Sequence, residues 1–382
     1  MKILYCIHSL CNSGGMERVL SLKVNYLTKY YGYKIMIVTT EQKNRVPFYT
    51  IDSSITHIDL GINFNDDITL FQKIINRKNK LLKYKHELIE IIEQNQIDIC
   101  ISLGWKEISF LQELPNNVIK ICERHFAKNA EMLLAQSLYR NKLLSNIVGH
   151  YATNKLQNNT KKLDKLVVLT KEDEFEWKKT HNNIAQIYNP LPYELGRVSL
   201  LTSKRFITVG RLEAQKGFDL LIEAWKPIAL SHPDWSVDIY GDGSLRLSLQ
   251  KKIDDNNLTD KVRLKGISNN IDKEYKSSSG FIMSSRYEGF PMVLLEAASF
   301  GLPLISFDCV SGPKEIIQNN YNGILIEFGN ISKLSEAICQ MIENENARTI
   351  MGHNARKVAE DFTIDKIMSE WDNLFKSLKN KS

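Results

Sequence analysis

The sequence lacks the patterns on which several classes of protein depend. None of its six cysteines stands in a CxxC pair, and Cys6, Cys100 and Cys122 lie inside apolar runs. We therefore expect buried thiols in a reducing compartment, with no disulfide or zinc frame. No apolar run approaches the roughly 20 residues of a membrane span, and the N-terminal apolar stretch is too short and too β-like for a signal peptide. These absences predict a cytoplasmic protein, or one bound to the inner face of the cell membrane.

Signatures of common catalytic sites are missing as well. The sequence contains no P-loop, no GxSxG and no HExxH motif. No Asp-x-Asp pair stands in an apolar setting, so a carboxylate-bound Mg²⁺ or Mn²⁺ is not indicated. We therefore predict neither a metal site nor a resident cofactor.

Positive charge is concentrated in one region. The chain of 382 residues has a net charge of +6, yet residues 71–171 alone hold 17 Lys and Arg against 9 Asp and Glu. A solvated face is the simplest interpretation, and an anionic partner is the alternative. Aromatic residues are not interleaved with these charges, so nucleic acid is not predicted as a partner. Anionic lipid or a phosphorylated acceptor would fit the region better.

The first half of the chain alternates strands with helices. Buried strands are predicted at residues 2–8, 34–40, 55–60, 97–103, 118–122 and 166–170. Helices are predicted at residues 16–30, ending at Gly32, and at residues 68–94, with an apolar face of Leu81, Leu82, Leu88, Ile89 and Ile92. Residues 131–165 are interpreted as a helix followed by an exposed loop that includes residues 158–162. Such alternation is typical of a parallel, doubly wound α/β sheet.

The same rhythm restarts after a polar linker at residues 189–204. Strands are predicted at residues 206–209, 237–240, 262–265, 281–283, 303–307 and 323–326, and helices at 217–230, 245–253, after Pro291, and at 331–342. Residues 348–378 close the chain as a helical segment with Trp371 and Phe375 on one face. We predict two domains, 1–188 and 189–363, with residues 364–382 packing back on the first. Two such sheets create a central cleft at the carboxyl ends of their strands.

One stretch, SSRYEGFPMVLLE at residues 284–296, joins a strand to a helix. The apolar run before it stops, the chain turns at Gly289 and Pro291, and a helical pattern begins. Glu288 lies in the turn and Glu296 about two helical turns later. This is the kind of joint at which α/β proteins place their chemistry. The two carboxylates can hold a ligand rich in hydroxyl groups, and the helix start between them can hold an anion.

A second loop carries two cations. The segment VGRLEAQKG at residues 209–217 follows the first strand of the second domain. Gly210 lets the chain turn, and Arg211 and Lys216 then stand just before a helix. Two cations beside a helix start suit a diphosphate. A chance pair of surface cations is the alternative.

Three other positions are weaker candidates. The turn around Asp242 and Gly243 follows a strand like a dinucleotide-binding loop, but Arg246 occupies the third glycine position, so NAD is only weakly indicated. A close backbone approach to a nucleotide is still compatible with it. Gly15 lies in a glycine pair between a strand and a helix, where it leaves backbone N–H groups open or simply makes a tight turn. His125 ends a strand, where a structural histidine and a functional one are about equally expected.

Together these motifs resemble those of the retaining bacterial glycosyltransferases of family 4, of the surface-polysaccharide type. The matching residues are GGMER at 14–18, VGRL and QKG within 209–217, YGDG at 240–243, and SSRYEGFPMVLLEA at 284–297. The similarity covers the whole chain and is strongest from residue 206 to 327. It implies the GT-B fold, in which two Rossmann-like domains face a central cleft. The N-terminal domain would bind the acceptor, and the C-terminal domain the nucleotide sugar.

The resemblance also implies a role for particular positions. Arg211 and Lys216 would hold the donor diphosphate, together with backbone N–H groups near Met292 and Val293. Glu296 would accept hydrogen bonds from the ribose. The other implied donor contacts are Glu288 at the sugar hydroxyls, Gly15 at the diphosphate, His125 near the C6 hydroxyl of the sugar, Ile267 near the base, and Asp242, Gly243, Gly289, Phe290 and Pro291 along the donor. Phe290-Pro291 stands where many members of the family have Phe-Gly.

The implied activity is transfer of a hexose or N-acetylhexosamine from a nucleotide sugar, with UDP as the expected nucleotide, to a lipid-linked or glycan acceptor. His125, Arg211, Lys216 and Glu288 would serve catalysis. Because no carboxylate is a clear nucleophile, front-face attack with retention is expected. Two alternatives remain: a UDP-sugar 2-epimerase, and a protein that binds nucleotide sugars without turnover. The segment 308–313 is similar to that of enzymes that use UDP-sugars, and the basic N-terminal half favours peripheral contact with an anionic membrane.

Overall fold

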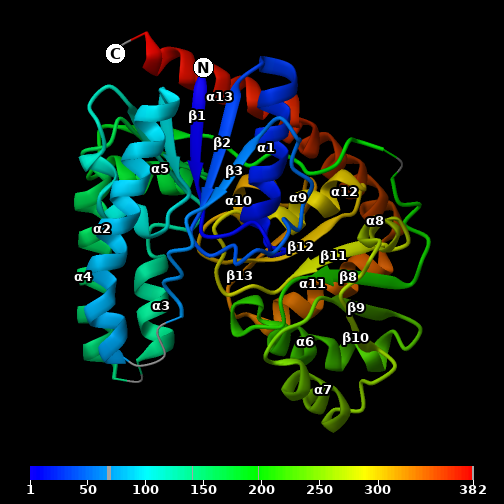
Figure 1. Cartoon of the computed structure of the whole chain (residues 1–382). Coiled ribbons are helices and arrows are strands. Elements are labelled where there is room, and N and C mark those ends of the chain that lie inside the picture. Colours follow the sequence, from blue (N-terminus) through cyan, green and yellow to red (C-terminus); the bar gives the residue numbers. More distant parts are fainter. Residues whose placement is uncertain (67–69, 140, 197, 381–382) are drawn as a thin grey trace. The chain divides into compact units, whose positions relative to one another are not determined.

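The computed structural model of the chain describes residues 1–66, 70–139, 141–196 and 198–380. It divides into two compact units (Figure 1). The first unit comprises Met1–Pro192 and Ile364–Ser382, and the second comprises Tyr193–Thr363. None of the described helices is long and apolar enough to cross a bilayer.

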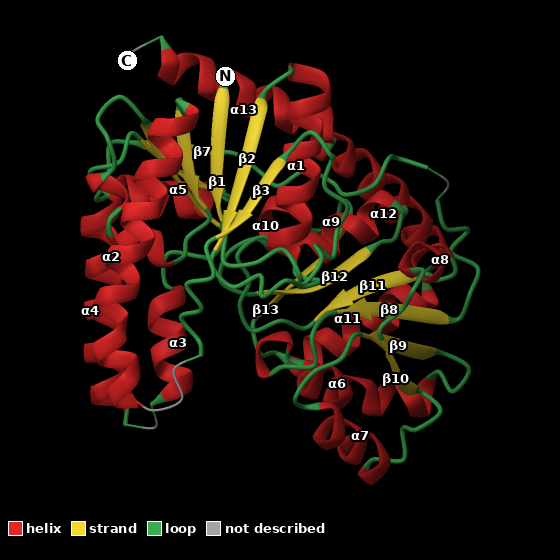
Figure 2. Ribbon diagram, in the orientation of Figure 1, coloured by secondary structure: helices red, strands yellow, loops and turns green. Residues whose placement is uncertain are grey.

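The first unit is built on a seven-stranded sheet with the order β3-β2-β1-β4-β5-β6-β7 (Figure 2). Its strands are β1 (Lys2–Cys6), β2 (Lys34–Thr39), β3 (Thr56–Asp59), β4 (Ile99–Ser102), β5 (Ile119–Arg124), β6 (Lys165–Val168) and β7 (Ile184–Gln186). All of these strand pairs run parallel. The central strands are apolar on both faces because helices cover both, as in other parallel sheets.

Helices cover both faces of this first sheet. They are α1 (Gly15–Tyr31), α2 (Leu70–Asn95), α3 (Ala130–Leu138), α4 (Lys142–Thr160), α5 (Lys171–Lys178) and α13 (Ile364–Lys379), with 3₁₀ turns at Lys106–Ser109 and Leu111–Glu113. One core cluster joins the sheet to α1 and α13, where Trp371 and Phe375, predicted on one face of a helix, are both buried. The other joins it to α2, α4 and α5 through Tyr84, Leu156 and Trp177.

Several sequence predictions for the first unit were wrong in detail. Leu82, predicted on the apolar face of α2, is 56% exposed, while Tyr84 two positions later is fully buried. Residues 158–160 end α4 rather than forming a loop, and Thr160 is buried with its hydroxyl donating to the Leu156 carbonyl at 2.9 Å. The short elements α5 and β7 were missed. Residues 68 and 69 of the predicted second helix lie outside the described residues.

The second unit is a six-stranded parallel sheet with the order β10-β9-β8-β11-β12-β13. Its strands are β8 (Arg205–Val209), β9 (Ser236–Tyr240), β10 (Val262–Gly266), β11 (Gly280–Met283), β12 (Leu304–Asp308) and β13 (Gly323–Glu327). Its helices are α6 (Phe218–Ser231), α7 (Arg246–Asp255), α8 (Ile271–Lys276), α9 (Met292–Ser299), α10 (Pro313–Ile316), α11 (Ile331–Glu343) and α12 (Glu345–Ala359), with 3₁₀ turns at Ala214–Lys216 and Glu360–Phe362. The strands predicted from apolar runs are confirmed, whereas the short helices α8 and α10 were missed.

The predicted closing helix is broken in two. Helix α12 belongs to the second unit, and the chain turns extended at Thr363 with φ −61° and ψ 151°. Helix α13 then contributes Ile367, Trp371 and Phe375 to the core of the first unit. The apolar face predicted for one closing helix is therefore divided between two helices, each of which packs in a different unit.

The strand order marks where a site is expected in each unit. In the second unit, successive strands are added on one side of β8 as far as β10, and then on its other side from β11 onward. The switch point therefore lies between β8 and β11. Ligands of open α/β sheets bind at such a switch point, outside the carboxyl ends of the strands, here β8 and β11. In the first unit the corresponding position lies between β1 and β4.

Candidate active site

The loops after β8 and β11 are bonded to each other. The backbone N–H of Arg286 donates to the Gln215 carbonyl at 2.7 Å, and the Gln215 amide donates to the Tyr287 carbonyl at 3.0 Å. The Ser284 hydroxyl donates to the Lys216 carbonyl at 2.9 Å. The two motifs that the sequence singled out are thus one structure, although about 70 residues separate them in the chain.

An ion pair lies between these loops. Lys216 Nζ is 2.7 Å from Glu288 Oε1, and the two side chains are only 16% and 7% exposed. The Ser285 hydroxyl donates to the same oxygen at 2.6 Å. Glu288 Oε2 receives no hydrogen bond from any residue in the described part of the chain. One carboxylate oxygen is therefore fixed by protein, and the second has no such partner.

Gly217 makes this close approach possible. Its φ of +63° is in the left-handed region, and a Cβ there would lie 2.1 Å from the Ser284 carbonyl oxygen. Such a distance is far inside van der Waals contact, so a side chain would push the two loops apart. The glycine that the sequence placed at a helix start is required by the neighbouring loop.

A second ion pair anchors the same region and was missed by sequence reasoning. Arg286 donates to both carboxylate oxygens of Asp219 in α6, at 2.8 and 2.7 Å, and to the Ala214 carbonyl at 2.7 Å. Hydrogen bonds from Arg286 lower the pKa of the Asp219 carboxyl. The spacing of 67 residues leaves no local signal for this pairing; only the position of Arg286 inside the longest motif could have suggested a role.

Arg211 differs from Lys216 in its surroundings. It is exposed, and its guanidinium forms no hydrogen bond or ion pair with another described residue. The remaining predicted anion donors are at the start of α9. There the Met292 N–H already donates to the Phe290 carbonyl at 2.9 Å, whereas Val293 lies in the first turn, whose N–H groups have no intrahelical acceptor. Met292 is thus the weaker of the two predicted backbone donors.

The turn before α9 is held by the loop after β12. The Ser311 hydroxyl donates to the Gly289 carbonyl at 3.2 Å. Gly312 has φ +101°, and a Cβ there would lie 2.4 Å from Pro291 Cδ. Phe290 is buried, with its ring centroid 5.9 Å from that of Phe362. Gly289, Phe290 and Pro291 are therefore fixed by packing inside the unit.

Glu296 is more deeply covered than the sequence suggested. It lies in the second turn of α9 with 5% exposure, and the Tyr275 hydroxyl donates to its Oε2 at 3.1 Å. Tyr275 belongs to α8, is fully buried, and stacks on Phe300 with centroids 5.2 Å apart. The carboxylate thus has a fixed orientation, which a specific hydroxyl clamp requires.

Backbone hydrogen bonds join the carboxyl ends of β8, β9 and β10. The Leu212 N–H donates to the Asp242 carbonyl at 2.9 Å. A Cβ on Gly243 would lie 2.7 Å from the Leu212 carbonyl oxygen, so this glycine is needed for loop packing whatever it binds. The Asp242 carboxylate lies 3.7 Å from Arg246, and Ile267 at the end of β10 is 75% exposed. An exposed apolar side chain at this edge suits a flat ring.

In the first unit, the predicted residues lie at the carboxyl edge of the sheet. Gly15 begins α1, and a Cβ there would meet no atom within 4 Å. His125 directly follows β5; its side chain is 7% exposed, and its Nε2 lies 3.2 Å from Glu123 Oε1. Glu123 in turn forms a buried ion pair with Lys23 of α1. Neither Lys23 nor Glu123 was singled out from the sequence, although a charge on an apolar helix face was a signal for Lys23.

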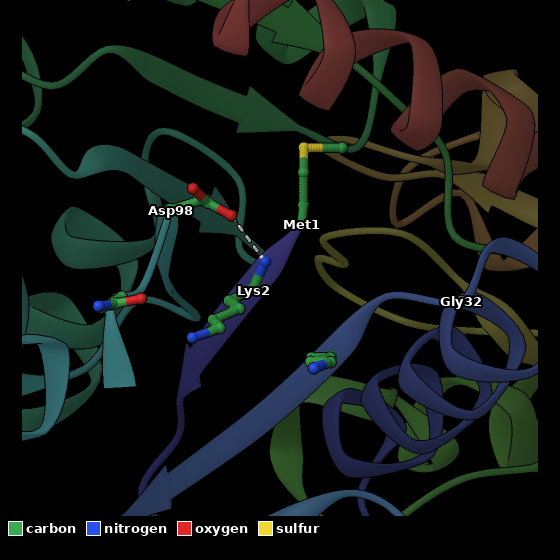
Figure 3. Close-up of a pocket in the computed structure, with 6 residues that line it drawn as sticks. Met1, Lys2, Gly32 and Asp98 are labelled. Atoms are coloured by element: carbon green, nitrogen blue, oxygen red, sulfur yellow. Dashed lines mark hydrogen bonds between the residues drawn. The ribbon is translucent and has the colours of Figure 1, made fainter. Parts of the chain in front are cut away.

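Two surface hollows are lined by other residues. One, of about 390 Å³, is at the amino end of β1, where the Lys2 N–H donates to Asp98 Oδ2 at 2.8 Å (Figure 3). The other, of about 650 Å³, adjoins Asp308 and Lys314 after β12. The first is at the opposite edge of its sheet from Gly15 and His125, so it does not coincide with the predicted site. In the described residues, no group of three or more His, Cys, Asp or Glu side chains is placed to hold a metal ion.

Comparison with known proteins finds a family match within the second unit. Residues 198–358, all within the second unit, match the family described as "Glycosyl transferases group 1". This segment is therefore a group 1 glycosyltransferase domain. The two parallel sheets and the similarity to solved glycosyltransferase structures confirm the GT-B fold class predicted from the sequence.

Similar proteins extend over the full length. An uncharacterized glycosyltransferase of Haemophilus influenzae is 28% identical over 97% of this chain and 98% of its own. A Campylobacter jejuni α-1,4-N-acetyl-D-galactosaminyltransferase, whose name gives a PP-undecaprenol-linked glycan as acceptor, is 26% identical over 100% of this chain and 99% of its own. A mutant of S. aureus TarM, crystallised with fondaparinux, α-GlcNAc-glycerol and UDP, superposes with a TM-score of 0.80 at 18% identity, over 98% of this chain and 99% of its own.

Proposed function

We propose that this protein is a retaining glycosyltransferase of family 4 that transfers a hexose or N-acetylhexosamine from a UDP-sugar to a lipid-linked or glycan acceptor, in the synthesis of a surface polysaccharide. The observation that carries this proposal is the joined pair of loops after β8 and β11. They bring Lys216 and Glu288 into contact beside the exposed Arg211 and the start of α9. A cationic point next to a carboxylate suits a ligand with a diphosphate at one end and hydroxyl groups at the other.

The chemistry follows from where charge develops. When the glycosidic bond to the diphosphate breaks, negative charge grows on the leaving oxygen. Lys216 has three N–H donors and gives one to Glu288, so the others can serve phosphate oxygens. Arg211 would add a two-pronged contact, and the Val293 N–H would complete the anion site. Cations fixed in place before the reaction stabilise such a transition state without reorganisation.

The remaining donor contacts keep the roles that the resemblance implies. Glu288 Oε2 would accept hydrogen bonds from the sugar hydroxyls, and Glu296 from the ribose. Ile267 would lie near the base, with Asp242 and Gly243 along the nucleotide. Gly15 and His125, from the first unit, would contact the diphosphate and the C6 hydroxyl of the sugar.

Membrane contact by the first unit is part of this proposal. The five most exposed large apolar side chains of α3 and α4 form what we term the α3–α4 surface: Leu134 (58%), Leu138 (69%), Leu143 (72%), Ile147 (59%) and Tyr151 (68%). The segment 126–162 holds six Lys and Arg and a single Glu. Apolar groups framed by cations are what an anionic bilayer binds. A polyprenyl-diphosphate acceptor would be presented at such a surface.

The test is release of UDP that depends on both donor and acceptor. UDP-hexoses and UDP-N-acetylhexosamines are supplied with a polyprenyl-diphosphate-linked sugar, and the product anomer is assigned by NMR. Arg211→Ala and Lys216→Ala should each lose most of the activity. Lys226→Ala is the matched control, because Lys226 forms an exposed pair with Glu223 at 2.6 Å on α6 of the same unit. Full activity in both site variants would refute the assignment of the site.

The same assay separates the alternatives. An epimerase would convert the UDP-sugar without any acceptor, so its product would appear in the acceptor-free reaction. A protein that only binds would show saturable UDP-sugar binding and no turnover across the panel. An inverted anomeric product would refute retention while leaving glycosyl transfer intact.

A further inference from the structure

A buried ion pair lies in the first unit away from any of the predicted donor contacts except His125. Lys23 Nζ is 2.6 Å from Oε1 and 2.5 Å from Oε2 of Glu123. Each of the two side chains is only 1% exposed. Lys23 comes from α1 and Glu123 from β5, so the pair links a helix to the central sheet.

The surroundings explain how the charges are tolerated. Lys23 Nζ lies 3.7 Å from the ring centroid of Trp371, in α13, and 5.8 Å from that of Tyr5 in β1. Aromatic faces attract a cation, most strongly when water is excluded. Burial alone would raise the pKa of the Glu123 carboxyl, but Lys23 and His125 reverse this and lower the pKa to about 2. Glu123 is therefore an anion throughout the neutral range.

Burying two charges costs desolvation free energy, which the attraction between them often does not exceed. Replacing a buried ion pair by apolar side chains of similar size is often neutral or stabilising. A fully buried pair in the core of a sheet therefore calls for a second reason, and we find it in the polar group two residues after Glu123, just past the end of β5.

His125 is that group. Its Nε2 is buried and forms no hydrogen bond with any described residue, and Glu123 Oε1 is its ion-pair neighbour at 3.2 Å. Buried ring nitrogens are almost always satisfied. A small rotation of the imidazole would direct an Nε2–H at Oε1. Lys23 holds both oxygens of Glu123, so the carboxylate cannot swing away to meet solvent instead.

We propose that Glu123, clamped by Lys23, is a positioning residue for His125: it takes the Nε2–H and so leaves Nδ1 as the nitrogen that meets the ligand. In the neutral ring Nδ1 is then a hydrogen-bond acceptor, which selects a hydroxyl group rather than another acceptor. This inference rests on the proposed function, because the hydroxyl belongs to the sugar that the enzyme would transfer. It assigns to the Lys23–Glu123 pair a part in substrate recognition.

The first test is spectroscopic and needs no substrate. A histidine N–H in fast exchange with water gives no one-bond ¹H–¹⁵N signal, whereas one held by a buried carboxylate does. We expect such an Nε2–H signal in the histidine-labelled wild type, assigned by its disappearance in His125→Gln. It should vanish in the double variant Lys23→Met with Glu123→Met, which replaces the pair by apolar side chains and so avoids an unpaired buried charge. A signal that persists in the double variant, or never appears in the wild type, would overturn the proposal.

The second test is kinetic. Loss of the Lys23–Glu123 pair in the double variant should lower kcat by up to about 100-fold, with little change in KM for the donor. An effect of this size follows when a group at the reacting site is displaced by roughly 1 Å. Glu131→Gln is the matched control, since Glu131 is a carboxylate of the same unit that pairs with Arg124 instead of His125. It should leave both the signal and kcat unchanged.

These outcomes are separable from those of the proposed function. A wild type that transfers no sugar refutes the function, yet the Nε2–H signal still reports on the clamp. A wild type that is active and loses activity in His125→Gln, but keeps its kcat in the folded double variant, refutes the positioning role alone. Folding of the double variant is checked by circular dichroism and thermal melting.

Discussion

Lys216 and Glu288 are in direct contact across two loops, with Nζ 2.7 Å from Oε1, although 72 positions separate them in the chain. From the sequence motifs, these two residues were expected to act independently, Lys216 on a diphosphate and Glu288 on a sugar. In the structure each residue fixes the orientation of the other. Ser285 holds the same Glu288 oxygen. Both side chains are therefore arranged before any donor binds, which lowers the entropic cost of binding.

This contact predicts unequal effects on UDP binding. Lys216→Met removes a cation that would bond to the diphosphate, and a charge-assisted hydrogen bond is worth about 1.5–3 kcal/mol. We therefore expect UDP to bind about 10- to 100-fold more weakly, as measured by isothermal titration calorimetry. Glu288→Gln should leave UDP affinity unchanged or raise it, because Lys216 is then freed for phosphate, while transfer of the sugar is lost.

The control for this prediction is Lys226→Met, which removes an exposed cation from α6 of the same unit. Its UDP affinity should match the wild type. If Glu288→Gln weakens UDP binding as much as Lys216→Met does, the separate assignment of diphosphate and sugar to these two residues is wrong.

Gly217 gives a second prediction through its close contact with Ser284. Gly217 and Gly329 both have positive φ, of +63° and +80°, so alanine at either position costs about 1–2 kcal/mol in backbone strain. Only at Gly217 would the new Cβ also meet backbone, 2.1 Å from the Ser284 carbonyl oxygen. We expect Gly217→Ala to lose UDP binding and to lower the melting temperature well beyond Gly329→Ala. Equal effects of the two variants, in calorimetry and thermal melting, would show that the loop contact is unimportant.

Much of the fold was predictable because parallel sheets carry an unusually plain signal. Strands such as β1 and β12 are apolar on both faces, and glycines or polar residues punctuate the joints between elements. The position of the main loop at residues 284–291 followed from the same reasoning. Of the elements that were missed, β7 and α10 have only three and four residues, too few for any periodicity to show.

The partners inside the site were harder to predict for a different reason. Arg286 and Asp219 pair over 67 positions, and Lys23 and Glu123 over 100. Nothing local in the sequence specifies such a pairing, because it depends on which strands become neighbours in the sheet. Likewise, the role of Gly243 became clear only when Leu212 of the adjacent loop was seen to occupy the space of its missing side chain.

The membrane contact proposed for the α3–α4 surface predicts how vesicle binding should respond to substitutions. Leu143 and Ile147 are 72% and 59% exposed on the same face of α4. Changing both to Ser should reduce co-sedimentation with phosphatidylglycerol-rich vesicles about tenfold or more, since each fully inserted side chain is worth about 1.5–3 kcal/mol. Binding of the wild type should also fall as salt rises, because the neighbouring cations are screened.

Leu230→Ser provides the comparison for the membrane experiment. Leu230 is 86% exposed on α6 of the second unit, so its loss removes similar apolar area without touching the surface in question. It should bind vesicles as the wild type does. Wild-type binding that is absent, or that is equal on phosphatidylcholine vesicles and insensitive to salt, would contradict the proposed contact.

The buried pair of Lys23 and Glu123 predicts a specific dependence of stability on pH. The folded pKa of Glu123 is about 2, below the value of about 4.3 expected in the unfolded chain. A carboxyl whose pKa is lowered by folding stabilises the folded state, and this contribution is complete at pH values above the unfolded-state pKa. It is lost as pH falls from about 4.3 towards 2. Burial lowers the pKa of Lys23 as well, so at neutral pH its charge opposes folding, and Glu123 offsets that cost.

The wild type should therefore lose more free energy of unfolding between about pH 4.3 and 2 than the double variant Lys23→Met with Glu123→Met. At neutral pH the double variant should be about as stable as the wild type, whereas Glu123→Gln alone should lose about 3–5 kcal/mol, because it leaves Lys23 buried without a counter-charge. Urea unfolding of the first unit at several pH values measures all three. If the free energy of unfolding falls equally with acid in the wild type and in the double variant, the pKa of Glu123 is not lowered in the folded protein. A mild Glu123→Gln effect would mean that water reaches Lys23, contrary to its 1% exposure.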